Sequence, residues 1–76
     1  MSEKLVRITG SELIRALERT GFVVKRQKGS HVHLFRDIDH RRVTVPVHKG
    51  RIIPIGTFKA ILKDADLSAD ELRKLL

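Results

Sequence analysis

The tripeptide Gly29-Ser30-His31 holds the residues best suited to chemistry, because it lies between two β-like runs and beside Lys25, Arg26 and Lys28. A histidine with an unperturbed pKa of about 6.5 accepts and releases protons near neutral pH. Lysine and arginine bind phosphate. Cleavage of RNA through its own 2′-hydroxyl needs a base on that oxygen and an acid for the leaving 5′-oxygen. His31 is therefore the candidate catalytic residue, within a cationic cluster that could bind a polyanion.

The other histidines leave more than one interpretation open. His33 is expected on the same strand face as His31, about 6.5–7 Å away. The two could act as a base–acid pair on a phosphate, or they could simply be two outward-facing histidines. His48 and Lys49 follow the third β-like run, where a loop could bring them to the basic surface. His40 lies in a charged turn and is expected to be solvated.

Two competing chemistries have weaker support. A metal could bind the pair His31-x-His33 with oxygen from Asp37 or Asp39, but the usual tetrahedral ligand spacing is absent from the sequence. Ser30 as an acyl-transfer nucleophile is disfavoured because adjacent strand residues point to opposite faces.

The charge of the chain favours an anionic partner. Sixteen Lys and Arg against nine Asp and Glu give a net charge of +7. Such a balance fits nucleic acid, an acidic protein or an anionic membrane surface, or only a solubilising surface. Three phenylalanines are the only aromatic rings of the Phe, Tyr and Trp type, so stacking of bases is not expected to dominate binding.

The length and composition predict one small domain, residues 1–76. A chain of this size has no material for a second lobe. It contains no cysteine, which excludes disulfides and thiolate metal sites. No apolar run approaches the roughly 20 residues that span a bilayer, and the N-terminus lacks a signal-peptide core. We therefore expect a cytoplasmic protein with no membrane association.

The elements that must position these residues follow the order α-β-β-β-α with a short final helix. A capping box at Thr9–Glu12 opens a helix of about 11 residues that Gly21 ends. Thr57 is expected to cap the second helix, and a capping box at Ser68–Glu71 to open the third, with Leu72, Leu75 and Leu76 on its apolar side. The strands are predicted at 22–27, 31–36 and 41–47, with the last at an edge or ending at Pro46. This is an α+β fold in which helices cover one face of a three-stranded antiparallel sheet.

A family resemblance is carried by five stretches: Thr9–Leu17, Gly21-Phe22, Arg26–His31, Arg42–His48 and Gly56–Lys63. Together they resemble the HicA toxin family of bacterial and archaeal toxin–antitoxin systems. The resemblance implies a fold similar to the double-stranded RNA-binding domain and the activity of a messenger-RNA interferase. It also implies that His31 acts in RNA cleavage, that no metal cofactor is needed, and that a HicB-type antitoxin covers this surface. The turn Asp37–His40 and the apolar loop Arg51–Ile55 depart from the family pattern, and the isoleucines of that loop could face a partner or pack beneath it.

Two function classes therefore remain: a metal-independent endoribonuclease toxin, and a non-catalytic RNA-binding module with the same fold and charge. An adaptor for an acidic protein is a third possibility. For the first, the expected catalytic residue is His31. The expected RNA-binding residues are Lys25, Arg26, Lys28, Gly29, Ser30, His48 and Lys49.

Overall fold

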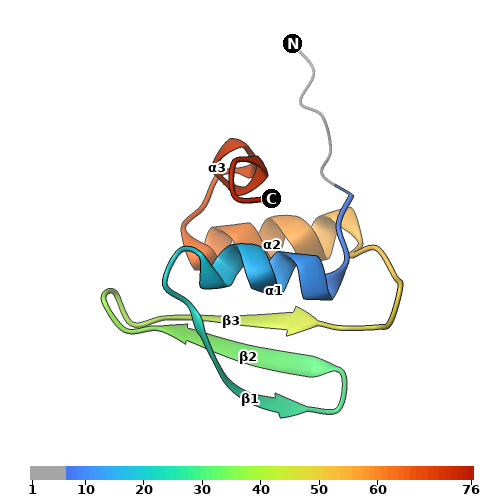
Figure 1. The fold of residues 1–76 in the computed structure, drawn as a ribbon, viewed down its shortest axis with the longest axis horizontal. Helices are drawn as coiled ribbons and strands as arrows, with labels where there is room; N and C mark the ends of the chain where they lie inside the picture. Colours follow the sequence, from blue (N-terminus) through green and yellow to red (C-terminus); the bar gives the residue numbers. More distant parts are fainter. Residues whose placement is uncertain (1–6) are drawn as a thin grey trace.

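Three helices and three strands form the fold of the computed structural model, which describes residues 7–76 (Figure 1). In chain order they are α1 (Gly10–Glu18), β1 (Val23–Lys28), β2 (His31–Arg36), β3 (Arg41–Pro46), α2 (Ile55–Ala65) and α3 (Ala69–Arg73). The predicted α+β class and the order α-β-β-β-α with a short final helix are confirmed. Within residues 7–76, no helix is both long enough and apolar enough to cross a membrane.

The sheet is an antiparallel meander in the order β1-β2-β3. The bounds of β2 match the prediction, whereas β1 starts and ends one residue later than expected. β3 lies at an edge of the sheet and ends at Pro46, one residue before the predicted end. An edge strand tolerates proline, which has no N–H to donate to a further strand.

The capping boxes of α1 and α3 form as predicted. The Thr9 hydroxyl accepts from the Glu12 N–H at 3.2 Å, and the Glu12 carboxylate accepts from the Thr9 N–H at 2.9 Å. These hydrogen bonds hold the pKa of Glu12 below its usual value. α1 is shorter than expected, at nine residues, and Gly21 follows it with φ of 98°.

The predicted cap of α2 at Thr57 is wrong. The helix begins at Ile55, and its N-cap is Pro54, with no side-chain cap hydrogen bond. The Pro54 carbonyl already accepts from the Phe58 N–H at 2.9 Å, so Thr57 lies within the first turn instead of before it.

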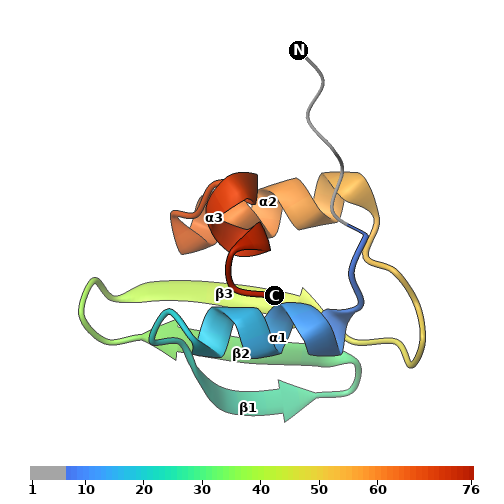
Figure 2. The ribbon, with the colours of Figure 1, turned by 45° about the horizontal axis from the view of Figure 1, so that its top comes forward.

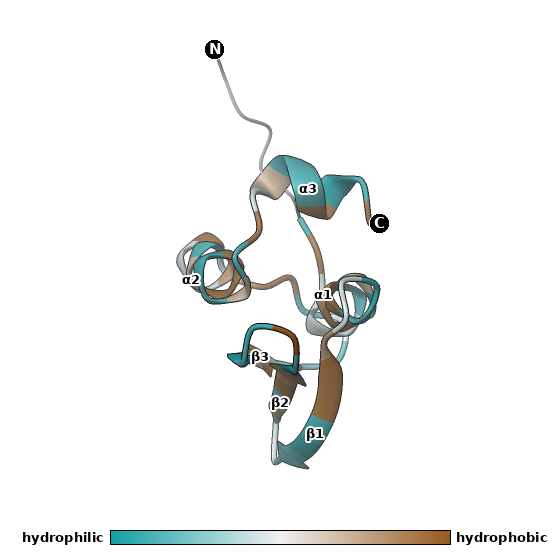
Figure 3. Cartoon of the chain, turned by 90° about the vertical axis from the view of Figure 1, so that its left-hand side faces the viewer, coloured by the Kyte–Doolittle hydropathy of each residue, from teal (hydrophilic) through white to brown (hydrophobic). Residues whose placement is uncertain are grey.

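The core fills the space between one face of the sheet and the helices (Figures 1 and 2). α2 and α1 both contact β3. β1 lies on the side of the sheet away from α2 (Figure 3), and every residue of β1 is exposed. α3 adds Leu72, which is fully buried, while Leu75 is only partly buried. Leu76, expected on the same apolar side, is 58% exposed, so that part of the prediction is wrong. The buried hydrophobic residues of the sheet and the two long helices are Leu13, Ala16, Leu17, Val32, Leu34, Val43, Val45, Phe58, Ile61, Leu62 and Ala65.

A half-buried arginine joins the elements at the end where β2 turns into β3. The Arg36 guanidinium binds the Asp39 carboxylate through two nitrogens, at 3.0 and 2.8 Å, and donates to the Ala65 carbonyl at 3.0 Å. It also lies over the Phe22 ring, 4.5 Å from its centroid. The hydrogen bond from Arg36, with the charges of Arg36 and Arg41, holds the pKa of Asp39 below its usual value.

Candidate nucleic-acid interface

A two-residue turn positions His31. Lys28 and His31 are paired across it, and Gly29 and Ser30 are the central residues. Gly29 has φ of +59°, and Ser30 is not among the residues with positive φ. This pattern is that of a type II′ turn, whose first central position favours glycine and whose twist matches that of a β-hairpin. His31 is therefore held at the start of β2, exposed and directly opposite the Lys28 cation.

The same end of the sheet carries the loop after β3. The Val47 N–H donates to the Ser30 carbonyl at 2.6 Å, which joins this loop to the turn between β1 and β2. His48 and Lys49 follow directly and are exposed. Figure 1 shows the turn, the end of β3 and this loop at one end of the molecule. The structure thus brings these predicted residues to the same end as His31.

A β-bulge decides where the cations of β1 point. Val24 pairs with Leu34, but the next pair is Arg26 with His33, so Lys25 is an extra residue in β1. Strict alternation would place Arg26 on the face of Leu34, toward the helices. The bulge moves Arg26, and with it Lys28, to the face that carries His33 and His31.

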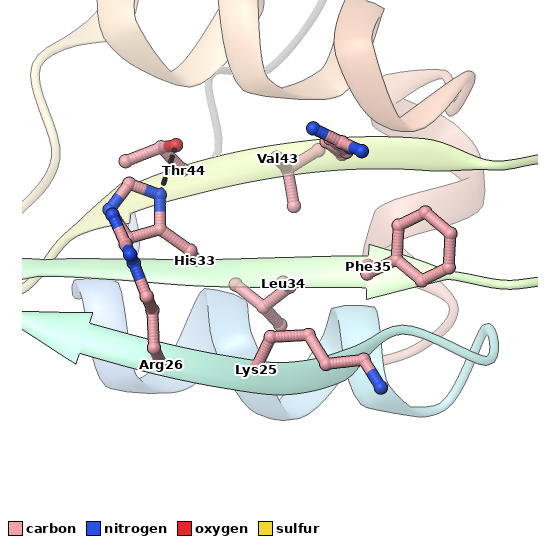
Figure 4. Close-up of a pocket in the computed structure, with 8 residues that line it drawn as sticks. Lys25, Arg26, His33, Leu34, Phe35, Val43 and Thr44 are labelled. Atoms are coloured by element: carbon pink, nitrogen blue, oxygen red, sulfur yellow. Dashed lines mark hydrogen bonds between the residues drawn. The ribbon is translucent and has the colours of Figure 1, made fainter.

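A groove of about 560 Å³ lies on the open face of the sheet, next to His31 along β2. Figure 4 shows Arg26 and Lys25 rising beside it from β1. His33 is half-buried in it, and its Nδ1 lies 3.1 Å from the Thr44 hydroxyl. Its lining residues are Lys25, Arg26, His33, Leu34, Phe35, Arg42, Val43 and Thr44.

Among the polar residues of this groove, sequence reasoning missed Arg42 and Thr44. They alternate with Val43 and Val45, which are buried against the helices. That alternation is a signal that could have placed both on the open face. The Arg42 guanidinium lies over the Phe35 ring, 5.9 Å from its centroid, so it adds a third cation to the groove.

A second depression, of about 350 Å³, lies beside the loop after β3. His48 and Arg51 line it together with Ile52 and Ile53. Ile53 is buried, at 6% exposure, whereas Ile52 and Ile55 are 44% and 42% exposed. Both alternatives for the isoleucines of the apolar loop are therefore seen: Ile53 packs beneath the loop, whereas Ile52 and Ile55 stay at the surface, where a partner could contact them.

The alternative metal site gains no support from the geometry. Across residues 7–76, no three His, Asp, Glu or Cys side chains gather in a way that could hold a metal ion. Asp39, one of its candidate ligands, is bound by Arg36 and lies 3.2 Å from the Arg41 guanidinium. His40 is exposed, as expected, at the other end of β2.

The chain matches the model of a known protein family. A family model described as "HicA toxin of bacterial toxin-antitoxin" matches residues 10–67. This stretch includes His31 and every residue predicted to bind RNA. The comparison with curated proteins finds no significant match.

Proposed function

We propose that this chain, which belongs to the HicA toxin family of bacterial toxin–antitoxin systems, is an endoribonuclease that cleaves messenger RNA. Membership makes it the toxin of such a pair and implies an antitoxin partner. The single observation that supports the nuclease is the position of His31: it is exposed on the open side of the sheet and faces Lys28 across the turn. A proton-transfer group and a cation are thus accessible to a large polyanion.

The proposed reaction uses the 2′-hydroxyl of the RNA as the nucleophile. His31 takes the proton from this hydroxyl, and the oxygen attacks the adjacent phosphorus. The bond from phosphorus to the 5′-oxygen breaks, and the leaving oxygen receives a proton from an acid, which is water or a second side chain. Lys28 stabilises the negative charge on the phosphorane. The products are a 2′,3′-cyclic phosphate and a free 5′-hydroxyl, and we propose that no metal is required.

The RNA backbone is proposed to follow the basic end of the sheet. Lys28 and the backbone of Gly29 and Ser30 contact the scissile phosphate, and Lys25, Arg26, His48 and Lys49 contact its neighbours. The side chains of Lys25, Arg26, Lys28, His48 and Lys49 are all exposed, which supports this path. Phosphate contacts of this kind supply affinity without reading sequence.

The proposed antitoxin is of the HicB type and inhibits by covering His31 and the cations around it. An acidic surface on the partner would match the charge of +7 on this chain. The exposed Ile52 and Ile55, at the same end as His48, would give such an interface an apolar part.

RNA integrity in cells tests the nuclease. The native chain and His31→Ala are induced at matched protein level without the antitoxin, and total RNA is analysed. We expect growth arrest and cut messenger RNA with the native chain only. A histidine elsewhere on the surface provides the control: His40→Asn is expected to cleave like the native protein, and asparagine tolerates the positive φ of 57° at that position.

The purified proteins separate the two function classes. His31→Ala is expected to keep RNA affinity within a few-fold, whereas Lys28→Ala weakens both affinity and cleavage. Cleavage by the native chain in the presence of EDTA tests metal independence. Full cleavage by His31→Ala would refute the assignment of His31, and native protein that binds RNA without cutting it would indicate the non-catalytic binding module.

A further inference from the structure

The groove on the open face of the sheet has the charge and size of a site for one nucleotide. Of the residues that the structure describes, three cations line it, Lys25, Arg26 and Arg42, and no carboxylate does. Its volume of about 560 Å³ lies within the range of sites that hold small ligands, about 300–1,000 Å³. The Phe35 ring lies at one end with the Arg42 guanidinium over it, and the two groups together form a surface on which a base can stack.

The groove also contains an oriented hydrogen-bonding group. The Thr44 hydroxyl lies 3.1 Å from Nδ1 of His33. If this hydroxyl donates to Nδ1, the neutral ring carries its proton on Nε2. Figure 4 shows the second ring nitrogen directed away from Thr44, on the side from which Arg26 approaches. The Nε2–H of His33 and the guanidinium of Arg26 would then both donate hydrogen bonds to one anionic oxygen.

We propose that this groove binds the nucleotide next to the scissile phosphate of a single-stranded RNA. Arg26 and Nε2 of His33 hold its phosphate, Thr44 is a positioning residue for the His33 ring, and Phe35 contacts the base. The proposal rests on the proposed function, which puts the scissile phosphate at His31. His33 follows His31 by two residues of β2, about 7 Å, which is close to the span of one nucleotide in an extended strand.

Single-stranded RNA fits this surface better than a duplex. The bases of a single strand are free to stack on an aromatic ring, whereas those of an A-form helix are stacked on each other. The helices cover the opposite face of the sheet (Figure 3), so no element within residues 7–76 covers the open face on which the groove lies.

A pair of charge-matched variants tests the phosphate contact. Arg26→Gln and Lys63→Gln each remove one positive charge, but Lys63 lies on α2, on the other side of the sheet. Binding of a fluorescent single-stranded RNA oligonucleotide is measured in the His31→Ala background, where the RNA stays intact. Arg26→Gln is expected to weaken binding about tenfold and to reduce the slope of log K against log salt by about 0.7. Lys63→Gln is expected to leave that slope unchanged.

A second set tests the orientation of His33. Thr44→Val keeps the shape of the side chain but removes the hydroxyl, and His33→Phe removes both nitrogens. Each is expected to weaken binding several-fold, while His33→Gln, which retains an N–H donor, is expected to keep most of it. In the native background, where His31 is present, the same substitutions should raise KM more than they lower kcat. Matched melting temperatures show that the variants are folded.

The outcomes separate this proposal from the nuclease itself. Equal effects of Arg26→Gln and Lys63→Gln on RNA affinity would mean that only the overall charge matters, and would refute nucleotide binding in the groove. Loss of antitoxin binding with unchanged RNA affinity in Arg26→Gln would assign the groove to protein and also overturn it. If the native chain cuts RNA and Arg26→Gln has an unchanged KM, the proposal that the groove binds a nucleotide is refuted, whereas the proposed nuclease activity is retained. If the native chain binds RNA through the groove but never cuts it, the nuclease fails.

Discussion

The Ser30 carbonyl oxygen accepts a hydrogen bond from the Val47 N–H at 2.6 Å. This bond joins the turn that carries His31 to the segment that leads to His48. Two parts of the proposed site, which are far apart in the sequence, are therefore held together by backbone atoms. Their relative position depends on the conformation of the turn, and hence on Gly29.

Gly29→Ala is expected to destabilise the fold by about 1 kcal/mol, because alanine must adopt the positive φ of the turn. A Cβ at Gly29 would have nothing within 4 Å, so the cost is one of backbone conformation and not of collision. Gly29→Asn is expected to cost less, since asparagine tolerates this region. Urea denaturation of the two variants measures the difference, and equal stability of Gly29→Ala and the native chain would contradict the turn geometry.

Gly10→Ala is expected to destabilise the fold for the opposite reason. Gly10 does not have a positive φ, but a Cβ there would collide with the Pro46 carbonyl and press on Val47. The start of α1 and the end of β3 would have to separate, at a cost of about 1–3 kcal/mol. Gly56→Ala is the matched control: its Cβ meets open space within α2, so it is expected to stabilise by about 0.4–1 kcal/mol. If Gly10→Ala and Gly56→Ala changed the free energy of unfolding in the same direction, this account would be contradicted.

Features specified by nearby residues could be predicted from the sequence. The bounds of β2 follow from the alternation of Val32 and Leu34 with polar residues, and both of these apolar side chains are buried. The capping boxes at Thr9 and Ser68 each involve a residue three positions away, so they form wherever the helix forms. The Gly29-Ser30 turn is equally local.

Features that depend on packing between distant residues could not be predicted from the sequence. The bulge at Lys25 exists only in the pairing of β1 with β2, yet it decides that Arg26 faces the groove. The start of α2 depends on how the preceding loop reaches the core through Ile53, and not on the capping ability of Thr57. The sequence thus predicts a set of candidate residues for the site, whereas it did not predict the groove beside them.

Truncation of core residues is expected to cost far more than truncation of exposed ones. Leu17 and Ile61 are 0% and 4% exposed, so Leu17→Ala and Ile61→Ala should each destabilise by about 2–5 kcal/mol. His31→Ala should change the melting temperature little, because His31 is exposed. Val24→Ala, at 39% exposure in β1, is a control for loss of apolar contact at the surface and should cost about 0.5 kcal/mol or less. Marked destabilisation by His31→Ala would indicate a structural histidine instead of a catalytic one.

Asp39 is expected to make stability depend on pH in the acid range. Its pKa is lowered in the folded chain, first by the hydrogen bond from Arg36, whereas an unfolded aspartate titrates near about 3.9. Its contribution is therefore fully present above that value and is lost as the pH falls through the lower, folded pKa.

The Asp39→Asn variant tests this assignment. At about pH 6 it should unfold at a lower urea concentration than the native chain. The two midpoints should converge only as the pH falls below the lowered pKa of Asp39 in the folded chain, because the native carboxylate is then protonated as well. Asp37→Asn, in the same turn, removes the same charge but none of the hydrogen bonds to Arg36, and so controls for net charge. A gap between Asp39→Asn and native midpoints that stays constant from neutral to acid pH would mean that the Arg36–Asp39 contact stabilises by packing and not through the charge of the carboxylate.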